Sequence, residues 1–308
     1  MTLPHTPAAW ANHISQMLIA VQKIHGLPRF PVDVTSIAKE FSKQVFPKEP
    51  ITLVKGIGMA DSLEGALFPN PNESGEWGIL YNSDIKSIGR QNYTLAHEFG
   101  HYLLHRHISP KGIECRKADM FEWNSEEGKI EAEANVFASY LLMPLDDFRE
   151  QIKGKQVTLE ILQQLASRYR VSISAAVLKW LSFTDQRAML VISKDGFIDW
   201  ARSSKPLLRS NVYFAARQVI TPLPEASLAA KANREFDNLS GVKHPKGVWN
   251  IDEPVTEMTI VSTNMTLTLL LYPKDKPWNA KQSDEDDEEG LLEDTHSRFL
   301  NFNKRMTE

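Results

Sequence analysis

The sequence has a single cysteine, Cys115, among 308 residues, and it has no long apolar run. One cysteine cannot form an internal disulfide, which argues against a disulfide-stabilised secreted scaffold. No uncharged apolar stretch approaches the ~20 residues that a membrane-spanning helix needs, so we expect no membrane partner. Residues 1–20 lack the basic segment that precedes the apolar core of a signal peptide. These absences predict a cytoplasmic protein.

Neither sign of charge dominates, since 35 Lys+Arg face 39 Asp+Glu for a net charge of -4. Apolar residues make up 42% and charged residues 24% of the chain, which excludes wholesale disorder and a collagen-like fibre. The acids gather in residues 283–294, which hold eight acids and no base; without them the balance would be +4. We predict a disordered acidic tail over 276–308. Alternatively, this segment mimics nucleic acid and competes for a basic surface on the chain.

Hydrophobic periodicity predicts an α+β protein. An apolar stripe that starts at Trp10 predicts a helix ending at Gly26, and Asp33 is placed to cap a second helix. Residues 51–82 contain short β-type runs separated by turn residues, which predict a small sheet. Helical periodicity then returns over two segments, 85–104 and 125–142, with a polar loop between them.

The second half of the chain changes character twice. Residues 157–182 predict two short helices whose turn falls at Val171-Ser172, a cadence similar to a helix-turn-helix. Such helix pairs are also common packing units, so DNA binding is one of two interpretations. From Arg187 the pattern is β-rich and includes a hairpin around Thr263-Asn264. The predicted divisions are 1–156, a helical linker over 157–183, a sensor-sized domain over 187–275, and the tail over 276–308.

The motif that carries chemistry is HEFGH at residues 97–101. His97 and His101 are four residues apart on a predicted helix, so both imidazoles share a face and can reach one metal ion. Glu98 follows the first histidine, where its carboxylate can act as a general base on a water molecule. This pattern is typical of zinc peptidases, although it is short enough to arise by chance.

A second helix, rich in small residues, can complete the metal site. A catalytic zinc ion takes three protein ligands and keeps one position open. Glu131 or Glu133 can supply the third ligand, and because they lie about 200° apart on a helix, only one can face the metal. Ala134 would allow the helices to pack closely. Asn135 lies one turn after Glu131 and could hydrogen-bond a ligand histidine.

The two blocks YTLAHEFGHYLLH and EAEANVFASYLLMP resemble the ImmA/IrrE family of zinc metallopeptidases, in order and in spacing, over about residues 30–150. The resemblance implies a zincin-like domain with one Zn²⁺ per chain. It implies His97, His101 and Glu131 as the metal ligands and Glu98 as the catalytic base.

The same resemblance implies a layout and a biological role. Family members commonly add helix-turn-helix-like helices and a GAF-like sensor domain, which the regions 157–182 and 187–275 resemble. They typically cleave a helix-turn-helix repressor encoded nearby, and so turn on genes of mobile elements, stress responses or anti-phage defence. Within the family, the chain also resembles the CapP-type peptidases that regulate CBASS anti-phage operons.

Cys115 lies between His101 and Glu131 in the sequence, in the predicted polar loop. Thiolate is a good zinc ligand, so Cys115 could fill the open position and hold the enzyme inactive. Arg116 and Lys117 would favour the thiolate. The alternative is an incidental loop cysteine.

A basic segment over 187–217 offers a trigger for such a switch. Its aromatic residues Trp200, Tyr213 and Phe214 are interleaved with bases, which suits single-stranded nucleic acid because bases stack on aromatic rings. DNA damage would supply such strands. The alternatives are an ordinary solvated strand face and a small-molecule ligand. The candidate contacts to single-stranded DNA are Arg202, Lys205, Arg209 and Arg217.

Some functional details stay open. The EWGILYN run at 76–82 could be the edge strand that pairs with an extended substrate. The oxyanion of the reaction needs a donor, and the candidates are Tyr93, Tyr140, His105 and His107. Two alternative functions remain: a DNA-binding regulator whose zinc site is structural or vestigial, and a broad peptidase without a dedicated partner.

Overall fold

The computed structural model describes the chain except for residues 1–2, 61, 73–74, 117–125, 215, 217–218, 232–237, 250–252, 263–264 and 275–308. The chain forms two compact units. The first contains residues up to Lys153 together with Ala166–Ser172, and the second contains Gly154–Leu165 and the described residues from Ile173 onward. The division therefore passes through the predicted helix pair. The predicted acidic tail over 276–308 lies outside the described residues.

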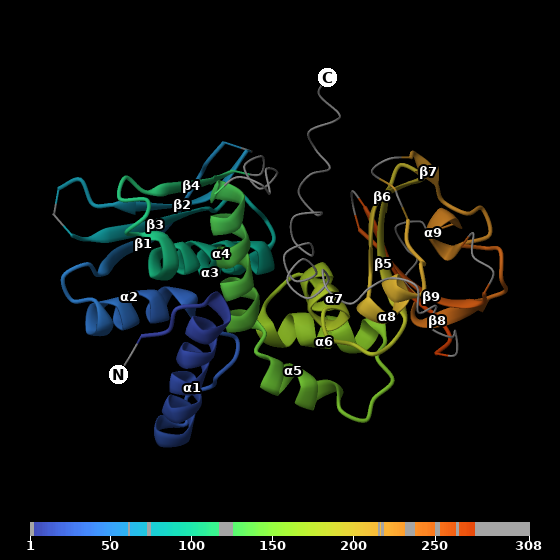
Figure 1. Ribbon diagram of the computed structural model, residues 1–308, viewed down its shortest axis with the longest axis horizontal. Coiled ribbons are helices and arrows are strands. Elements are labelled where there is room, and N and C mark those ends of the chain that lie inside the picture. Colours follow the sequence, from blue (N-terminus) through green and yellow to red (C-terminus); the bar gives the residue numbers. More distant parts are fainter. Residues whose placement is uncertain are drawn as a thin grey trace. The chain divides into compact units, whose positions relative to one another are not determined.

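The first unit consists of a four-stranded sheet covered by helices. Its strands are β1 (Ile51–Ile57), β2 (Leu63–Pro69), β3 (Trp77–Asn82) and β4 (Ile113–Arg116), in the order β1-β3-β2-β4. β1 and β3 are parallel, and the other neighbours are antiparallel. The helices are α1 (Pro7–His25), α2 (Val34–Val45), α3 (Ile88–His105), α4 (Glu126–Leu142) and α5 (Leu145–Ile152). Figure 1 shows α3 lying along one face of the sheet, with α2 beside it.

The prediction that residues 76–82 form an edge strand is wrong. Residues 77–82 form β3, which lies between β1 and β2 and has both of its backbone edges paired. The outer strands are β1 and β4; β4 pairs with β2 and lies inside the predicted polar loop. Four residues are too few to show alternating hydrophobicity, so β4 has no clear signal in the sequence.

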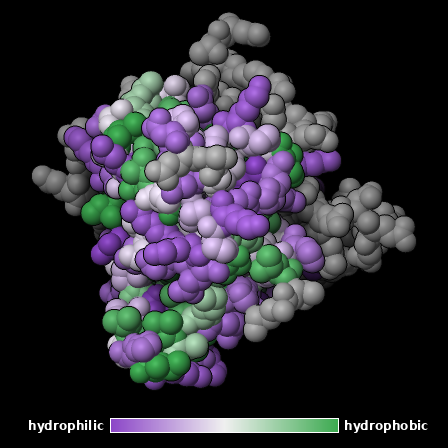
Figure 2. Space-filling model, turned by 90° about the vertical axis from the view of Figure 1, so that its left-hand side faces the viewer, coloured by the Kyte–Doolittle hydropathy of each residue, from purple (hydrophilic) through white to green (hydrophobic). Residues whose placement is uncertain are grey.

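Local signals set the ends of the first helices as predicted. Thr6 caps α1, and Gly26 ends it with φ of 68°, a left-handed conformation that costs glycine little. Asp33 caps α2, and its Oδ1 accepts a hydrogen bond from Ser36 N at 3.1 Å. The last turn of α1 leaves apolar side chains exposed, with Ile24 74% exposed. Apolar side chains gather at the lower end of the face in Figure 2, where this helix ends.

Close packing of α3 against α4 positions the site. Gly100 on α3 faces α4 so closely that an added Cβ would lie 2.9 Å from the Phe137 ring and 3.2 Å from Ala134 Cα. Ala134 and Phe137 are both fully buried. The small residue expected at 134 therefore brings two helix backbones together, with residues 97–101 on one and Glu131 on the other.

The second unit is a six-stranded antiparallel sheet with short helices. Its strands are β5 (Ala188–Lys194), β6 (Phe197–Ser203), β7 (Thr221–Pro222), β8 (Asn238–His244), β9 (Val255–Val261) and β10 (Thr266–Leu271), in the order β7-β6-β5-β10-β9-β8. The named helices of this half are α6 (Leu159–Tyr169), which the division cuts, α7 (Ile173–Leu181), α8 (Lys205–Arg209) and α9 (Leu228–Lys231). β9 and β10 pair as the predicted hairpin, whose tip at 263–264 is not described.

A buried carboxylate organises the core of the second unit. Glu257 on β9 accepts hydrogen bonds from Trp249 Nε1 at 3.0 Å and from the backbone N–H groups of Leu228 and Ala229. These contacts hold the start of α9 against the sheet. The two units together confirm the predicted α+β class, whereas the GAF-like identity of the second unit stays a prediction. None of the described helices is long and apolar enough to cross a membrane.

Candidate metal centre

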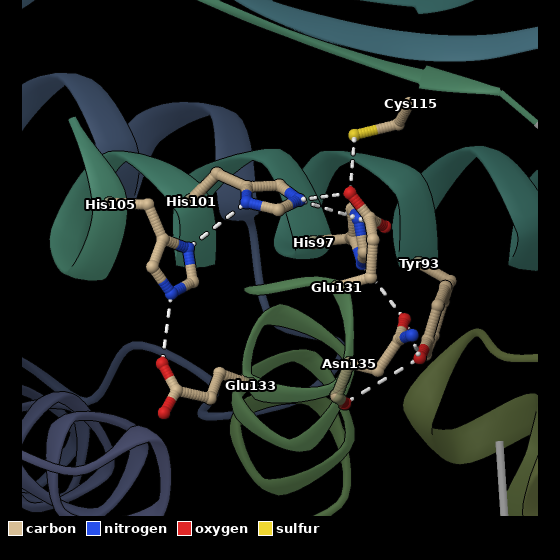
Figure 3. A network of polar contacts seen from close by, with 8 residues as sticks. All are labelled: Tyr93, His97, His101, His105, Cys115, Glu131, Glu133 and Asn135. Carbon is tan, nitrogen blue, oxygen red and sulfur yellow. Dashed lines mark hydrogen bonds and ion pairs between the residues drawn. The ribbon is translucent and has the colours of Figure 1, made fainter. Parts of the chain in front are cut away.

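α3 presents a row of three histidines to α4. His97, His101 and His105 follow one another at intervals of four residues, so they lie on one face of the helix, and all three are buried. The Nε2 atoms of His97 and His101 are 2.9 Å apart, with both ring edges turned to the same point (Figure 3). The two histidines of the HEFGH motif therefore converge as the sequence predicts.

Two other elements bring further ligand atoms to this point. Glu131 on α4 lies with its carboxylate 3.0 Å from His97 Nε2 and 3.2 Å from His101 Nε2. Cys115 on β4 lies with its Sγ 3.8 Å from Glu131 Oε1 (Figure 3). One ligand atom from each of these four residues lies within 4.8 Å of the others. Three elements that are distant in sequence thus meet at one buried cluster.

The chemistry of the cluster suits a metal ion. Imidazole nitrogen, thiolate sulfur and carboxylate oxygen are all donors that Zn²⁺ accepts. In addition, both carboxylate oxygens of Glu98 are buried without a hydrogen-bond partner among the described residues. A buried polar group without a hydrogen-bond partner lowers the free energy of unfolding by roughly 1–3 kcal/mol. Such a group therefore indicates a bound ligand. The residues present therefore fit a metal centre with a carboxylate beside it.

Hydrogen bonds on the far side of His97 orient it as a ligand. Its Nδ1 lies 2.8 Å from Asn135 Oδ1, which also accepts a hydrogen bond from the Tyr93 hydroxyl at 2.8 Å. An amide oxygen only accepts, so His97 Nδ1 carries a proton, and Nε2 is the ring atom turned to the cluster. The structure thus places Asn135 against a ligand histidine. Tyr93, a candidate oxyanion donor, instead supports Asn135.

The electrostatics of the cluster are dominated by burial and by Glu131. Burial raises the pKa of Glu98 to about 8. Burial opposes the charged forms of His97 and Glu131, but their mutual attraction outweighs it: it raises the pKa of His97 to about 9 and holds that of Glu131 well below its usual range. Burial lowers the pKa of His101 to about 4, and the neighbouring His97 contributes.

The environment of Cys115 differs from the sequence prediction. Burial raises the pKa of its thiol well above the usual range, and the carboxylates of Glu98 and Glu131 raise it further. For Arg116, the expectation that a neighbouring base favours the thiolate is therefore wrong in this environment, because burial and two carboxylates outweigh it. Lys117 itself lies outside the described residues.

Gly65 on β2 is a site residue that sequence analysis missed. An added Cβ would lie 2.6 Å from Glu98 Oε1 and 2.6 Å from Thr94 Cγ2, so the carboxylate sits directly against the backbone of β2. Gly65 also pairs with Cys115 across the sheet. A glycine within a strand can mark such a close approach, which is the signal that could have identified it.

Substituting Gly65 with alanine is expected to reduce peptidase activity at least tenfold while zinc affinity changes little, because the new methyl group displaces Glu98 rather than a ligand. Side-by-side assays of peptide cleavage and of zinc affinity would check this. Gly58→Ala is the matched control, since its Cβ would meet only the Asp84 carboxylate at 3.0 Å. Equal activity of Gly65→Ala and wild type would contradict this role of the glycine.

The remaining predicted residues are dispersed. His107 is 69% exposed and lies 3.6 Å from Glu49, away from the cluster. In the second unit, Arg202 and Lys205 are partly buried and Arg209 is exposed, whereas Arg217 lies outside the described residues. The structure therefore does not gather these bases into a described site.

Other residues of the basic segment 187–217 pack in the core of the second unit. Arg187 is buried in a two-contact ion pair with Glu253, at 2.6 and 2.8 Å. Phe214 packs against Trp249 with ring centroids 6.2 Å apart, whereas Tyr213 is exposed. Arg187 and Phe214 are therefore removed from any nucleic-acid surface.

Comparison with known proteins identifies the region that holds the cluster. Residues 61–181 match the IrrE N-terminal-like domain, Peptidase_M78. Over 129 residues the chain is 33% identical to the radiation response metalloprotease IrrE of Deinococcus radiodurans. The alignment covers 42% of this chain and 36% of that protein, so the chain spans about a third of its relative's length. Residues 61–181 therefore form a region similar to the IrrE N-terminal-like metallopeptidase domain.

Proposed function

We propose that the chain is a zinc-dependent endopeptidase that cleaves a helix-turn-helix repressor and thereby switches on a stress or anti-phage defence operon. The observation that carries the proposal is the buried group of His97, His101 and Glu131 with the unpartnered carboxylate of Glu98 beside it. The likeness to a radiation response metalloprotease supports the link to stress and DNA damage. The family's typical substrate supports the choice of a repressor.

In this proposal His97, His101 and Glu131 hold the zinc ion. A bound Zn²⁺ supplies a Lewis acid, which polarises a peptide carbonyl and lowers the pKa of a water ligand to roughly 7. Glu98 takes a proton from the attacking water and passes it to the leaving amine nitrogen. The backbone at Gly65 confines the Glu98 carboxylate, and the Asn135 amide oxygen holds His97 in its ligand tautomer.

The outer edge of β4, which pairs with no second strand among the described residues, is the proposed docking edge for the substrate. β4 is one of the two outer strands of the described sheet and carries Cys115 into the cluster, so an extended peptide paired to it would pass close to the proposed metal ligands. A hollow of about 530 Å³ beside β2 and β4 is lined by residues that include Leu63, Leu67 and Ile113. Side chains of an extended peptide alternate between the two faces of the sheet, so those on one face would point toward this hollow. Its apolar lining would accept apolar side chains.

Cys115 is the proposed inhibitory ligand. Its thiol is within reach of the same point as the three zinc ligands, so it can take the fourth position and exclude water from it. Cys115→Ser and Cys115→Ala are expected to raise basal cleavage about tenfold or more, because serine and alanine bind zinc weakly or not at all. Comparing initial rates of the three proteins with equal zinc content checks this. Unchanged basal rates would exclude an inhibitory role for the thiol.

Single-stranded DNA is the proposed trigger, acting on the second unit. Exposed Tyr213 and Arg209 offer an aromatic ring and a base of the kind that binds unpaired strands. Labelled oligonucleotides should bind with an affinity that falls as salt rises, since phosphate contacts release counterions. Salt-independent binding, or none, would favour a small-molecule trigger.

The direct test of the function uses the product of the neighbouring gene. The full chain, loaded with zinc, is incubated with that protein with and without single-stranded DNA, and Glu98→Gln serves as the inactive control. We expect cleavage by the wild type only, accelerated by the oligonucleotide, with one scissile bond identified by mass spectrometry. Absence of cleavage under every condition would refute the proposal.

A second candidate function is a DNA-binding regulator with a structural zinc site. The observation that favours it is Cys115, which would complete four protein ligands and close the site. Glu98 argues against it, because a structural site that four other residues close has no use for an additional buried carboxylate. Retention of the fourth ligand in the presence of substrate and trigger would support this alternative.

A further inference from the structure

We propose that His105 and Glu133 form a positioning relay that fixes His101 in the tautomer and orientation needed for metal binding. This inference deepens the proposed function, since it assumes that His101 is a metal ligand. Neither residue belongs to the ligand set or contacts the reacting atoms. Their proposed role is to act through His101, on the side of its ring that faces away from the cluster.

The relay is a chain of two hydrogen bonds that leads away from the cluster (Figure 3). His101 Nδ1 lies 3.0 Å from His105 Nδ1. On its other side, His105 Nε2 lies 2.9 Å from Glu133 Oε2. His101 and His105 are buried, whereas Glu133 is 53% exposed at the far end of the chain. The relay thus connects a buried ligand to a carboxylate at the surface.

The identities of the groups dictate where the protons lie. An ionised carboxylate only accepts hydrogen bonds, so His105 Nε2 must donate to Glu133. A neutral imidazole that donates from Nε2 can only accept at Nδ1. Along this chain His101 Nδ1 donates to His105, which leaves His101 Nε2 as the atom that faces the cluster and the Glu131 carboxylate. Glu133 determines the tautomer of His101 through two hydrogen bonds.

The same device holds the other histidine ligand from a different partner. Asn135 accepts from His97 Nδ1, as His105 accepts from His101 Nδ1. Both ligand rings are thus fixed through Nδ1 by residues of α4, directly for His97 and through His105 for His101. Partners of this kind strengthen ligand histidines, and their loss typically costs 10–100-fold in metal affinity or activity.

This arrangement explains why the helix carries two glutamates two residues apart. Glu131 and Glu133 project on different sides of α4, and only Glu131 reaches the cluster. Glu133 meets the third histidine of the α3 row instead. Two adjacent buried histidines could each take either tautomer. Such a pair would serve no purpose here if it did not orient a metal ligand.

The first measurement is the tautomer itself, by long-range ¹H–¹⁵N correlation of the imidazoles in metal-free Glu131→Ala protein, where no carboxylate competes for a proton at His101 Nε2. In this background we expect His101 to carry its proton on Nδ1, and to populate both tautomers when His105→Leu is added. Adding Glu133→Ala should give an intermediate result, because His105 then loses the partner that fixes its own tautomer. A His101 protonated on Nε2 in the Glu131→Ala protein would overturn the proposal.

The second measurement is zinc affinity, by competition with a chromophoric chelator. We expect His105→Leu to bind zinc 10–100-fold more weakly and Glu133→Ala several-fold more weakly. His105→Gln should recover most of the affinity, since its amide can accept from His101 and donate to Glu133. The matched controls His107→Leu and Glu150→Gln lie away from the cluster and should bind as the wild type does. Affinity within twofold of wild type in His105→Leu would overturn the proposal.

The outcomes separate the relay from the proposed function. If the tautomers and affinities behave as expected but no peptide is cleaved, the relay stands and the peptidase proposal fails. If the wild type cleaves its partner while the variants keep full zinc affinity, the relay fails and the peptidase proposal stands. Should His105→Leu not fold, Glu133→Ala decides, because that side chain is half-exposed.

Discussion

Replacement of Glu98 by glutamine should lower the rate of peptide cleavage by about 10²–10⁴-fold and leave zinc in place. Glutamine has nearly the same shape, so it fits against Gly65 as the glutamate does. It cannot take a proton from water, so the general base is lost while the ligands His97, His101 and Glu131 are untouched. Single-turnover cleavage assays together with metal analysis measure both quantities.

The control for this substitution is another neutralised carboxylate. Glu150→Gln on α5 removes an exposed charge, and it should cleave at the wild-type rate. A Glu98→Gln protein that cleaves within tenfold of wild type would show that the proton is taken elsewhere. Loss of zinc from this variant would show instead that Glu98 is a ligand.

Removal of zinc by a chelator should lower the Tm of the first unit by about 8–16 °C. An ion present at 1,000 times its Kd stabilises the folded state by about 4.1 kcal/mol, and 1 kcal/mol corresponds to about 2–4 °C for a unit of this size. The physical reason is that Glu131 and the ligand histidines, buried together, lose the cation that satisfies them. Differential scanning calorimetry with and without chelator measures the shift.

Two comparisons make this measurement specific. Transitions that belong to the second unit should not move, because the ligands lie in the first. His97→Ala should already melt at the lower temperature and should not respond to the chelator, whereas Glu98→Gln should respond as the wild type does. A chelator shift in His97→Ala equal to that of the wild type would place the stabilising metal at another site.

The parts of the site that could be predicted from sequence depend only on residues that are close together in the chain. The convergence of His97 and His101 follows from the helical repeat, and the cap at Asp33 and the stop at Gly26 are signals within a few residues. The spacing of Glu131 and Asn135 on one helix could also be read directly. Each of these needs only a helix and its periodicity.

What could not be predicted depends on contacts between distant segments. Whether 77–82 is a central or an edge strand depends on its partners, so its interpretation as an edge was wrong. Gly65 approaches Glu98 because β2 packs on α3, and no local sequence pattern predicts this contact. The thiol of Cys115 is governed by burial and by two carboxylates from other elements rather than by its sequence neighbours. The partner of His105 likewise comes from another helix.

The glycine within the HEFGH motif has a consequence for metal choice. In the proposed metal centre, two ligands lie on α3 and one on α4, so the separation between the imidazoles and the carboxylate depends on the distance between the two helices, which pack at Gly100 and Ala134. Metal–ligand bond lengths vary by only about 0.2 Å. A methyl group at position 100 should therefore push the helices apart and favour ions with longer metal–ligand bonds, although every proposed ligand would be unchanged.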